Sequence, residues 1–390
     1  MESAAQCLTA PVESATSAAI ATTAVATLGL LWMARRALWP QQQQIIKGAL
    51  TTSIPKLSND EIAQISYPPD YFPGARDVFT PYGTIRVYEF GPEDGKKVLL
   101  IHGISTSCMT LGDVTNALVE KGCRVMLFDL FGRGYSDAPG DLPYDTRLFV
   151  SQILLVLASS PLAWTGTNGL RIIGYSLGGA IAANFAATFP EMVESLILLA
   201  PAGVIRHENI GRASRLIFTS GLVPERILAW LTKSRLRSPI ANAIKKKPQK
   251  VLSPIEDKED FVDVAVQEAT ETSTDAPTAF ELEVTRFVHW SLDFNPGYVP
   301  AMMSTIRHAP LMDQQPYWRK LRQRKLGTTA VIVGRKDTLV QHEDYEEDVL
   351  PMLGGRDSVF WRMIDEGGHN FPFTHPRQTL ELIYEFWNIE

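Results

Sequence analysis

This chain of 390 residues has few cysteines and no surplus of positive charge, and both scarcities exclude classes of function. Its three cysteines, Cys7, Cys108 and Cys123, provide neither a disulfide framework nor a metal-ligand spacing, which favours a reducing compartment. The chain also lacks any Asn-x-Ser/Thr acceptor for N-glycosylation. Its formal net charge of −6 argues against a nucleic-acid partner, because such a partner requires a large basic surface.

Three cofactor and metal motifs are missing as well. The sequence contains no P-loop, no Gly-x-Gly-x-x-Gly dinucleotide motif and no His-Glu-x-x-His zinc motif. We therefore expect neither a cofactor nor a metal. Hydrophobic residues make up 45% of the chain and charged residues 21%, as in folded globular proteins. The length suffices for one large α/β domain with an insertion, or for two ordinary domains.

The N-terminal segment contains a long stretch without charge. Residues 14–34 carry no charged side chain, and a stretch of this length can cross a bilayer core of about 30 Å. Arg35 and Arg36 follow it, which by the positive-inside rule would leave the rest of the chain in the cytosol. We expect residues 1–40 to form a single-pass membrane anchor and residues 41–73 a linker. A disordered or transit-like leader and a soluble packing helix are the alternatives.

Beyond the linker, short apolar runs alternate with segments of helical period. The expected strands are Asp77–Thr80, Thr84–Glu89, Val98–Ile101, Arg124–Phe128, Leu170–Ile173, Ser195–Leu199, Ala330–Val333 and Ser358–Ile364. The expected helices between and after them are Leu111–Lys121, Tyr144–Ser159, Gly179–Phe189 and Leu380–Trp387. Such alternation predicts right-handed βαβ crossovers and a mostly parallel sheet with helices on both faces. Residues 74–202 and 313–390 would form the two parts of this core.

The alternation stops between these two parts. Residues 203–312 show helical periods and no buried strand, and we interpret them as a helical lid inserted after the sixth strand. The alternative is an ordinary extra layer of helices that has no role at a functional site. The basic run Lys245–Lys250 could contact anionic headgroups, although a solvated loop is the plainer interpretation.

Four lid aromatics allow two interpretations. Phe287, Trp290, Phe294 and Tyr298 would either bind an apolar acyl chain or form the internal core of the lid.

The most informative motif is Gly174-Tyr-Ser-Leu-Gly-Gly179, between an expected strand and an alanine-rich helix. This pattern is typical of a sharp strand-to-helix turn that exposes the hydroxyl of Ser176. Gly174 and Gly178 suit it because residues two before and two after the serine must be very small. The motif predicts that Ser176 is a catalytic nucleophile, with a plain turn as the alternative.

A serine nucleophile needs a base, and the base needs an orienting carboxylate, in the chain order Ser, acid, His. Asp337 and His369 follow the expected strands Ala330–Val333 and Ser358–Ile364 in that order, so we assign them to these roles. Asp365 and Glu366 are alternative acids, but they are too close in sequence to His369 to reach the far side of its ring. The competing histidines are His102, His207, His289, His308, His342 and His375.

The oxyanion of a tetrahedral intermediate requires two backbone N–H donors. We expect one from Leu177, which follows the nucleophile at the start of a helix. The other is expected from Ile104, in the loop His102-Gly103-Ile104-Ser105 after the strand Val98–Ile101.

Together these residues resemble the α/β-hydrolase superfamily. The resemblance rests on His102-Gly103, on Asp129-Leu-Phe-Gly-Arg-Gly-Tyr-Ser136, on the motif at Ser176, and on Asp337 with His369. Within the superfamily the chain is similar to lidded lipases and esterases related to monoacylglycerol lipases, some of which carry an N-terminal membrane anchor. The resemblance implies an eight-stranded sheet with a lid.

These observations predict a serine hydrolase. We expect it to cleave a carboxylic ester of an apolar or lipid-like substrate through an acyl-enzyme on Ser176. A hydrolase or acyl transferase that acts on a polyketide-type ester or thioester would use the same residues. A binding protein that has kept the fold but lost catalysis is the third possibility.

Overall fold

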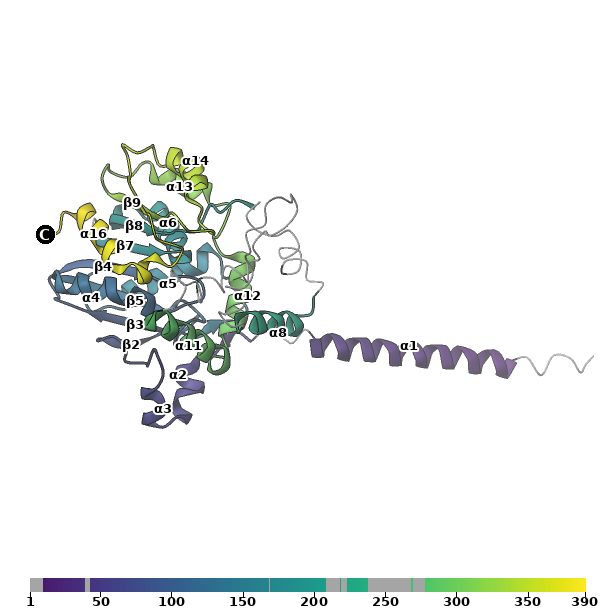
Figure 1. Cartoon of the computed structure of the whole chain (residues 1–390). Helices are drawn as coiled ribbons and strands as arrows, with labels where there is room; N and C mark the ends of the chain where they lie inside the picture. The colour runs from purple at the N-terminus through teal and green to yellow at the C-terminus, as the bar shows by residue number, and fades with distance from the viewer. Residues whose placement is uncertain are drawn as a thin grey trace, which may run out of the picture.

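The computed structural model describes residues 10–38, 43–167, 169–207, 218, 223–237, 268 and 278–390. An eight-stranded sheet forms its centre, with the strand order β10-β9-β8-β7-β4-β5-β3-β2 (Figure 1). The strands are β2 (Ala75–Thr80), β3 (Gly83–Phe90), β4 (Lys96–Ile101), β5 (Cys123–Phe128), β7 (Leu170–Tyr175), β8 (Val193–Leu199), β9 (Thr329–Gly334) and β10 (Phe360–Ile364). Within this sheet the pairs β2–β3 and β3–β5 are antiparallel and the other five pairs are parallel, so the predicted mostly parallel sheet is confirmed.

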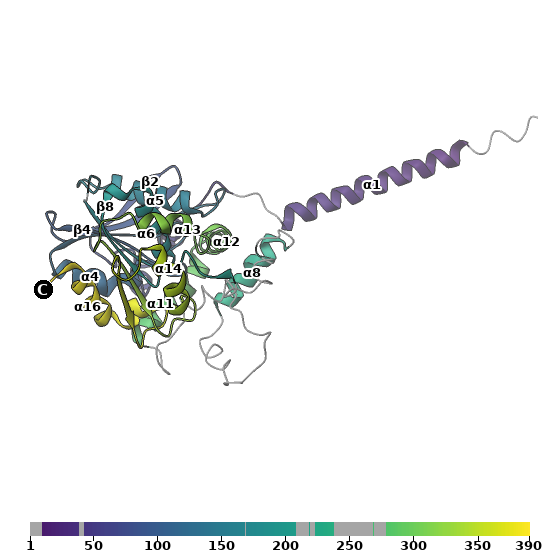
Figure 2. The same ribbon diagram turned by 90° about the horizontal axis from the view of Figure 1, so that it is seen from above.

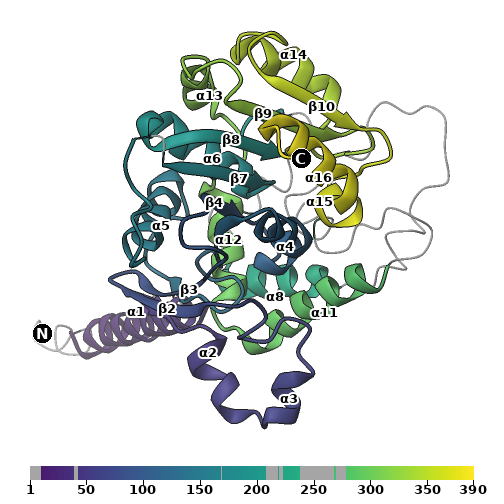
Figure 3. The same cartoon turned by 90° about the vertical axis from the view of Figure 1, so that its left-hand side faces the viewer.

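Helices cover both faces of this sheet. Figure 3 shows α4 (Gly112–Glu120) and α16 (Pro376–Trp387) on one face, and α5 (Thr146–Ala158) and α6 (Leu177–Thr188) on the other. The pleat of the strands supplies both cores, since successive side chains point to opposite faces. Along β4, for example, Leu99 and Ile101 belong to one buried cluster, and Val98 and Leu100 to the other. This explains why the central strands read as continuous apolar runs.

The chain between β8 and β9 contains described helices and no described strand. They are α8 (Glu225–Leu236), α11 (Ala279–Phe294), α12 (Tyr298–His308) and α13 (Gln315–Leu321). Helix α11 begins at a capping box, in which the Thr278 hydroxyl accepts from the Glu281 N–H and the Glu281 carboxylate accepts from the Thr278 N–H. The basic run Lys245–Lys250 lies outside the described residues.

After β9, helix α14 (His342–Met352) and the short helix α15 (Phe371–Thr374) complete the core.

The N-terminal segment forms a helix, α1 (Ala10–Leu38), which extends away from the sheet (Figures 1 and 2). Among the described residues, however, no helix combines the length and the apolar character needed to cross a membrane. The expected single-pass membrane anchor at residues 14–34 is therefore wrong, and the cytosolic orientation derived from it loses its basis. The physical reason is composition: the first part of the stretch is mostly alanine, serine and threonine, and strongly apolar residues occur only from Leu28 to Met33.

Much of the segment expected to be a linker is folded. Strand β1 (Ile45–Ile46) pairs with β6 (Ala138–Pro139), and α2 (Ala49–Thr52), the 3₁₀ helix η1 (Ile54–Lys56) and α3 (Asn59–Ala63) follow. One buried carboxylate ties this segment to the core. Asp137 accepts hydrogen bonds from the Gly48 N–H at 2.7 Å and from Lys47 Nζ at 2.9 Å.

Candidate active site

Ser176 lies at the sharp turn between β7 and α6. Its φ of 54° is in the left-handed region, where a residue with a side chain costs on the order of 1–3 kcal/mol. The two flanking glycines permit the close packing that this turn requires. A Cβ atom added to Gly174 would lie 2.3 Å from the Gly178 carbonyl oxygen, and one added to Gly178 would lie 2.1 Å from the Ile101 carbonyl oxygen. The glycines therefore allow the turn to pack directly against the end of β4.

The three side chains assigned from the sequence form a row of hydrogen bonds. His369 Nε2 lies 2.9 Å from Ser176 Oγ, and His369 Nδ1 lies 2.8 Å from Asp337 Oδ2. The other Asp337 oxygen accepts from the N–H groups of Leu339 and Val340, at 2.9 and 2.8 Å. A carboxylate can only accept at Nδ1, so this nitrogen carries the proton and Nε2 is left to accept from the serine hydroxyl. All three side chains are buried.

Sheet topology explains why residues so distant in sequence meet. Strands β9 and β10 are parallel neighbours, with Gly334 paired to Ile364, so the loops that follow them leave the same edge of the sheet. These loops touch, because the Lys336 N–H donates to the Gly367 carbonyl at 2.8 Å. The alternative acids Asp365 and Glu366 form ion pairs with Arg335 and Lys336 instead.

Three competing histidines have partners elsewhere. His207 lies 2.9 Å from Asp313, His342 lies 3.0 Å from Glu343, and His375 lies 2.9 Å from the Thr374 hydroxyl.

The expected oxyanion loop holds a carboxylate. The N–H groups of Ile104 and Ser105 both donate to the Glu268 carboxylate, each at 3.0 Å. The second expected donor, Leu177, is the first residue of α6, and the first N–H groups of a helix have no acceptor within the helix. The Gly178 contact with Ile101 brings the loop after β4 beside this helix start. The loop and the serine therefore share one edge of the sheet.

His102 orients the first peptide of this loop. Its Nε2 accepts from the Leu130 N–H at 2.9 Å, so Nδ1 carries the proton and donates to the Gly103 carbonyl at 2.9 Å. Because a trans peptide points its C=O and N–H in opposite directions, this bond turns the Ile104 N–H the other way. Complete burial lowers the pKa of His102 from 6.5 to about 3, so the ring is neutral.

Arg133 orients the second peptide. Its Nε donates to the Ile104 carbonyl at 2.9 Å, which directs the Ser105 N–H to the opposite side. The guanidinium also donates to the Thr305 hydroxyl at 2.8 Å, and Tyr298 Oη donates to the Ser105 carbonyl at 2.6 Å. Arg133 is fully buried, and this burial lowers its pKa from the ordinary value. The sequence indicated only a glycine-rich turn at this position.

One cluster has the composition of a metal site. His102, Cys108 and Asp129 bring one potential ligand atom each within 4.8 Å of one another. Hydrogen bonds already account for the imidazole and the carboxylate of this cluster. Both His102 nitrogens are engaged, and the Asp129 carboxylate accepts from the Cys108 N–H at 3.2 Å and the Tyr135 N–H at 3.0 Å. The donor set therefore suits a buried brace for the oxyanion loop better than a metal ion.

Three aromatic side chains of α11 pack against one another and against Tyr67. Phe287 meets Tyr67 edge to face at a ring distance of 4.9 Å, and Trp290 stacks on Phe287 at 5.5 Å. Phe294 continues the stack, at 5.3 Å from Trp290. These three rings are therefore engaged in packing contacts.

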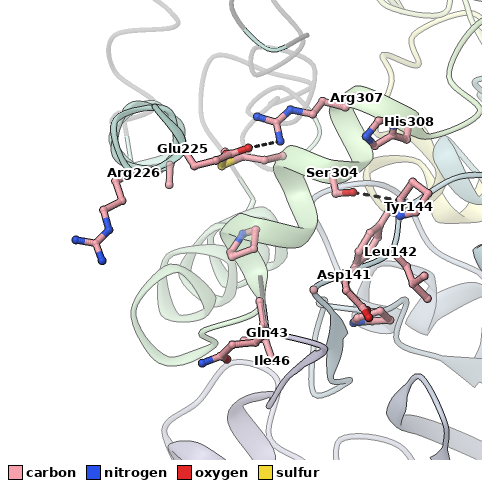
Figure 4. A pocket seen from close by; sticks show the side chains of 16 residues that line it. Gln43, Ile46, Asp141, Leu142, Tyr144, Glu225, Arg226, Ser304, Arg307 and His308 are labelled. Carbon is pink, nitrogen blue, oxygen red and sulfur yellow. Dashed lines mark hydrogen bonds and ion pairs between the residues drawn. The ribbon is translucent and has the colours of Figure 1, made fainter. Parts of the chain in front are cut away.

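A cavity of about 550 Å³ lies between α8, α12 and the segment after β6 (Figure 4). Pro300, Met303, Ser304 and Arg307 of α12 line it. Residues of α12 that contact the oxyanion loop and Arg133, such as Tyr298 and Thr305, lie on the opposite face of the helix by its 3.6-residue period. The cavity is therefore separated from the triad by α12.

Sequence comparison finds relatives among serine hydrolases. A family model described as serine aminopeptidase, S33, matches residues 92–268. The human serine hydrolase-like protein is 36% identical over 121 residues, which cover 30% of this chain and 56% of that protein. The Danio rerio serine hydrolase-like protein is 33% identical over 129 residues, which cover 33% of this chain and 38% of that protein. The chain thus spans about half or less of the length of these curated relatives.

Structural comparison supports the fold. A membrane phospholipase A described as a bacterial virulence factor has a TM-score of 0.57 at 19% identity, with 96% of this chain and 98% of that chain covered. A meta-cleavage product hydrolase from Pseudomonas fluorescens has a TM-score of 0.54 at 17% identity, with 80% and 97% covered. The chain therefore has the α/β-hydrolase fold and resembles serine hydrolases in sequence.

Proposed function

We propose that the protein is a serine hydrolase that cleaves a carboxylic ester of an apolar or lipid-like substrate through an acyl-enzyme on Ser176. The observation that carries the proposal is the unbroken row from Ser176 Oγ through the His369 ring to Asp337, with heavy-atom distances of 2.9 and 2.8 Å. These distances lie within the range needed for proton transfer between a nucleophile and its base.

In the first half of the reaction, His369 Nε2 takes the hydroxyl proton as Ser176 Oγ attacks the ester carbonyl. The same nitrogen then gives that proton to the departing alcohol, which leaves an acyl-enzyme. In the second half, water replaces the alcohol and His369 repeats both proton transfers. Asp337 holds the imidazole in one tautomer and stabilises its charged form, and the Leu339 and Val340 N–H groups fix the carboxylate.

Negative charge develops on the carbonyl oxygen in each half. The N–H groups of Ile104 and Leu177 are the proposed donors for it, and removal of one such donor typically slows an enzyme by about 10²–10³-fold. The first N–H groups of α6 and the positive end of its dipole add to this stabilisation.

The side chains next to the donors and the base are apolar or aromatic. Ile104 and Leu177 are buried in the core, and Tyr175 lies beside His369 at a ring distance of 5.6 Å. The likeness to a phospholipase is one of fold, so the apolar acyl group is the part of the proposal that a series of acyl lengths must test.

A substrate panel tests the proposal. Purified protein would be given p-nitrophenyl esters of increasing acyl length, matched acyl thioesters, and aminoacyl anilides, which an aminopeptidase would cleave. We expect ester hydrolysis that improves with acyl length and is abolished in Ser176→Ala. Turnover of thioesters alone would favour the polyketide-type alternative. Cleavage of the anilides alone, or ester cleavage that survives in Ser176→Ala, would refute the assignment.

A further inference from the structure

Glu268 bridges the two loops that flank the proposed nucleophile. Its carboxylate accepts from the Ile104 and Ser105 N–H groups, each at 3.0 Å. Its backbone carbonyl accepts from Asn370 Nδ2 at 3.2 Å, and Asn370 is the residue after His369. The residue thus extends from the histidine loop to the oxyanion loop, and its side chain is completely buried.

The loop side of this contact is a built carboxylate site. Besides the two N–H groups, the hydroxyls of Ser105 and Thr106 donate to Glu268 Oε1, at 3.3 and 3.2 Å. Gly103 leaves the space that the carboxylate fills, because a Cβ there would lie 2.3 Å from Glu268 Oε1. Such charge-assisted hydrogen bonds are roughly twice as strong as neutral ones.

The buried positive charge of Arg133 lies behind the same loop. Its guanidinium binds the Ile104 carbonyl, and the Glu268 carboxylate is one of the charges that act on its pKa. A site with two aligned N–H groups, two hydroxyls and a buried cation suits any oxygen anion. It suits the oxyanion of an ester intermediate as well as it suits Glu268.

We propose that Glu268 is an internal competitor that occupies the Ile104 N–H, one of the two proposed oxyanion donors, together with the neighbouring Ser105 N–H, and holds the enzyme in an inhibited state. This inference rests on the proposed function, since it concerns the same site. One N–H group at 3.0 Å from a carboxylate oxygen is not available to a second oxygen anion, so the Glu268 carboxylate must leave before the intermediate can be stabilised. The reaction rate is then proportional to the fraction of molecules in which the Glu268 carboxylate has left the loop.

A supporting role for Glu268 would predict the opposite result. If its carboxylate held the loop in shape, its removal would slow the reaction. The structure shows that the loop is held from its other side, by His102 on the Gly103 carbonyl, Arg133 on the Ile104 carbonyl and Tyr298 on the Ser105 carbonyl. The two N–H groups therefore keep their direction without Glu268.

The experiment compares labelling rates of the full chain by a fluorophosphonate, which phosphonylates the nucleophile and develops negative charge on its phosphoryl oxygen. The variants are Glu268→Ala and Glu268→Gln, with Glu283→Ala as a control for the loss of a half-buried carboxylate on α11. We expect Glu268→Ala to be labelled about 10-fold faster than wild type or more, since emptying the donors raises the competent fraction. Glu268→Gln should fall between the two, and Glu283→Ala should match wild type.

A second measurement separates competition from a change of shape. Acetate at constant ionic strength should slow labelling of Glu268→Ala by refilling the emptied site, and should leave wild type unaffected. Labelling of Glu268→Ala at or below the wild-type rate would overturn the proposal, and so would insensitivity of this variant to acetate. If neither wild type nor Glu268→Ala were labelled while both remained folded, the proposed function itself would fail.

Discussion

The contact of Gly178 with the end of β4 gives the sharpest test of how the chain builds its turn at Ser176. In Gly178→Ala the new methyl carbon would lie 2.1 Å from the Ile101 carbonyl oxygen and 2.6 Å from that of His102. Ordinary contact begins near 3.4 Å, so the backbone must separate by about 1 Å. Strand β4 cannot yield easily, because it is paired with β5 on one side and β7 on the other.

Overpacking of this kind costs about 1–3 kcal/mol, and a contact with fixed backbone belongs at the upper end. With a urea m-value of about 3 kcal/mol/M, a loss of 3 kcal/mol lowers the unfolding midpoint by roughly 1 M. Tryptophan fluorescence is a suitable probe, because the chain has 8 tryptophans. We also expect fluorophosphonate labelling to fall steeply, since the displaced turn carries the nucleophile.

Gly112→Ala is the matched control, because Gly112 also begins a helix but its added Cβ would lie 3.5 Å from Phe72, an ordinary contact. It should unfold at the wild-type midpoint or slightly above, as alanine favours a helix by about 0.5–1 kcal/mol over glycine. If Gly178→Ala had the wild-type unfolding midpoint and labelling rate, the close approach of Gly178 to the Ile101 carbonyl would not constrain the turn at Ser176.

Three further predictions follow from individual contacts. Asp337→Asn presents an amide N–H to His369 Nδ1, favours the wrong imidazole tautomer and should lower ester hydrolysis by about 10³–10⁴-fold. The control Asp365→Asn should leave hydrolysis unchanged, because the native Asp365 carboxylate pairs with Arg335. Tyr298→Phe removes the 2.6 Å hydrogen bond to the buried Ser105 carbonyl and should lower the free energy of unfolding by about 1–3 kcal/mol in a urea titration; an unchanged midpoint would argue against this bond. Burial lowers the pKa of His102 to about 3 and raises that of Asp129 to about 6. As pH falls below about 6.5, His102 binds a proton in the unfolded chain but not in the native protein, and this lowers the free energy of unfolding. Below about pH 6, Asp129 binds a proton in the native protein but not in the unfolded chain, and this offsets part of the loss. Asp129→Asn should accordingly lose about 1 kcal/mol more than wild type between pH 7 and pH 5, and equal losses would contradict the assigned shifts.

The core was predictable because its signals are local. Each central strand is a short apolar run, since both faces of the sheet are covered, and each appears in the structure within about two residues of its expected bounds. The partners Asp337 and His369 could be proposed because chain order and strand ends fix where they must lie. Their meeting at one sheet edge follows from the pairing of β9 with β10.

What the sequence did not indicate depends on contacts between distant segments. Glu268 reads as one charge in an acidic stretch, and its partner Ile104 is 164 residues away. Arg133 lies in what the sequence indicates only as a glycine-rich turn, and its burial against Ile104 and Thr305 depends on the fold. Residues 14–34 lack charge, but alanine, serine and threonine give them too low a hydropathy to form a membrane-spanning helix.

The central claim is that one hydroxyl, activated by the imidazole 2.9 Å away, carries the chemistry. Peptide mapping by mass spectrometry after fluorophosphonate treatment tests it most directly. We expect a single phosphonyl adduct on Ser176, which disappears in Ser176→Ala and is strongly reduced in His369→Ala. An adduct on another residue, or one on Ser176 that forms at the same rate without His369, would contradict it.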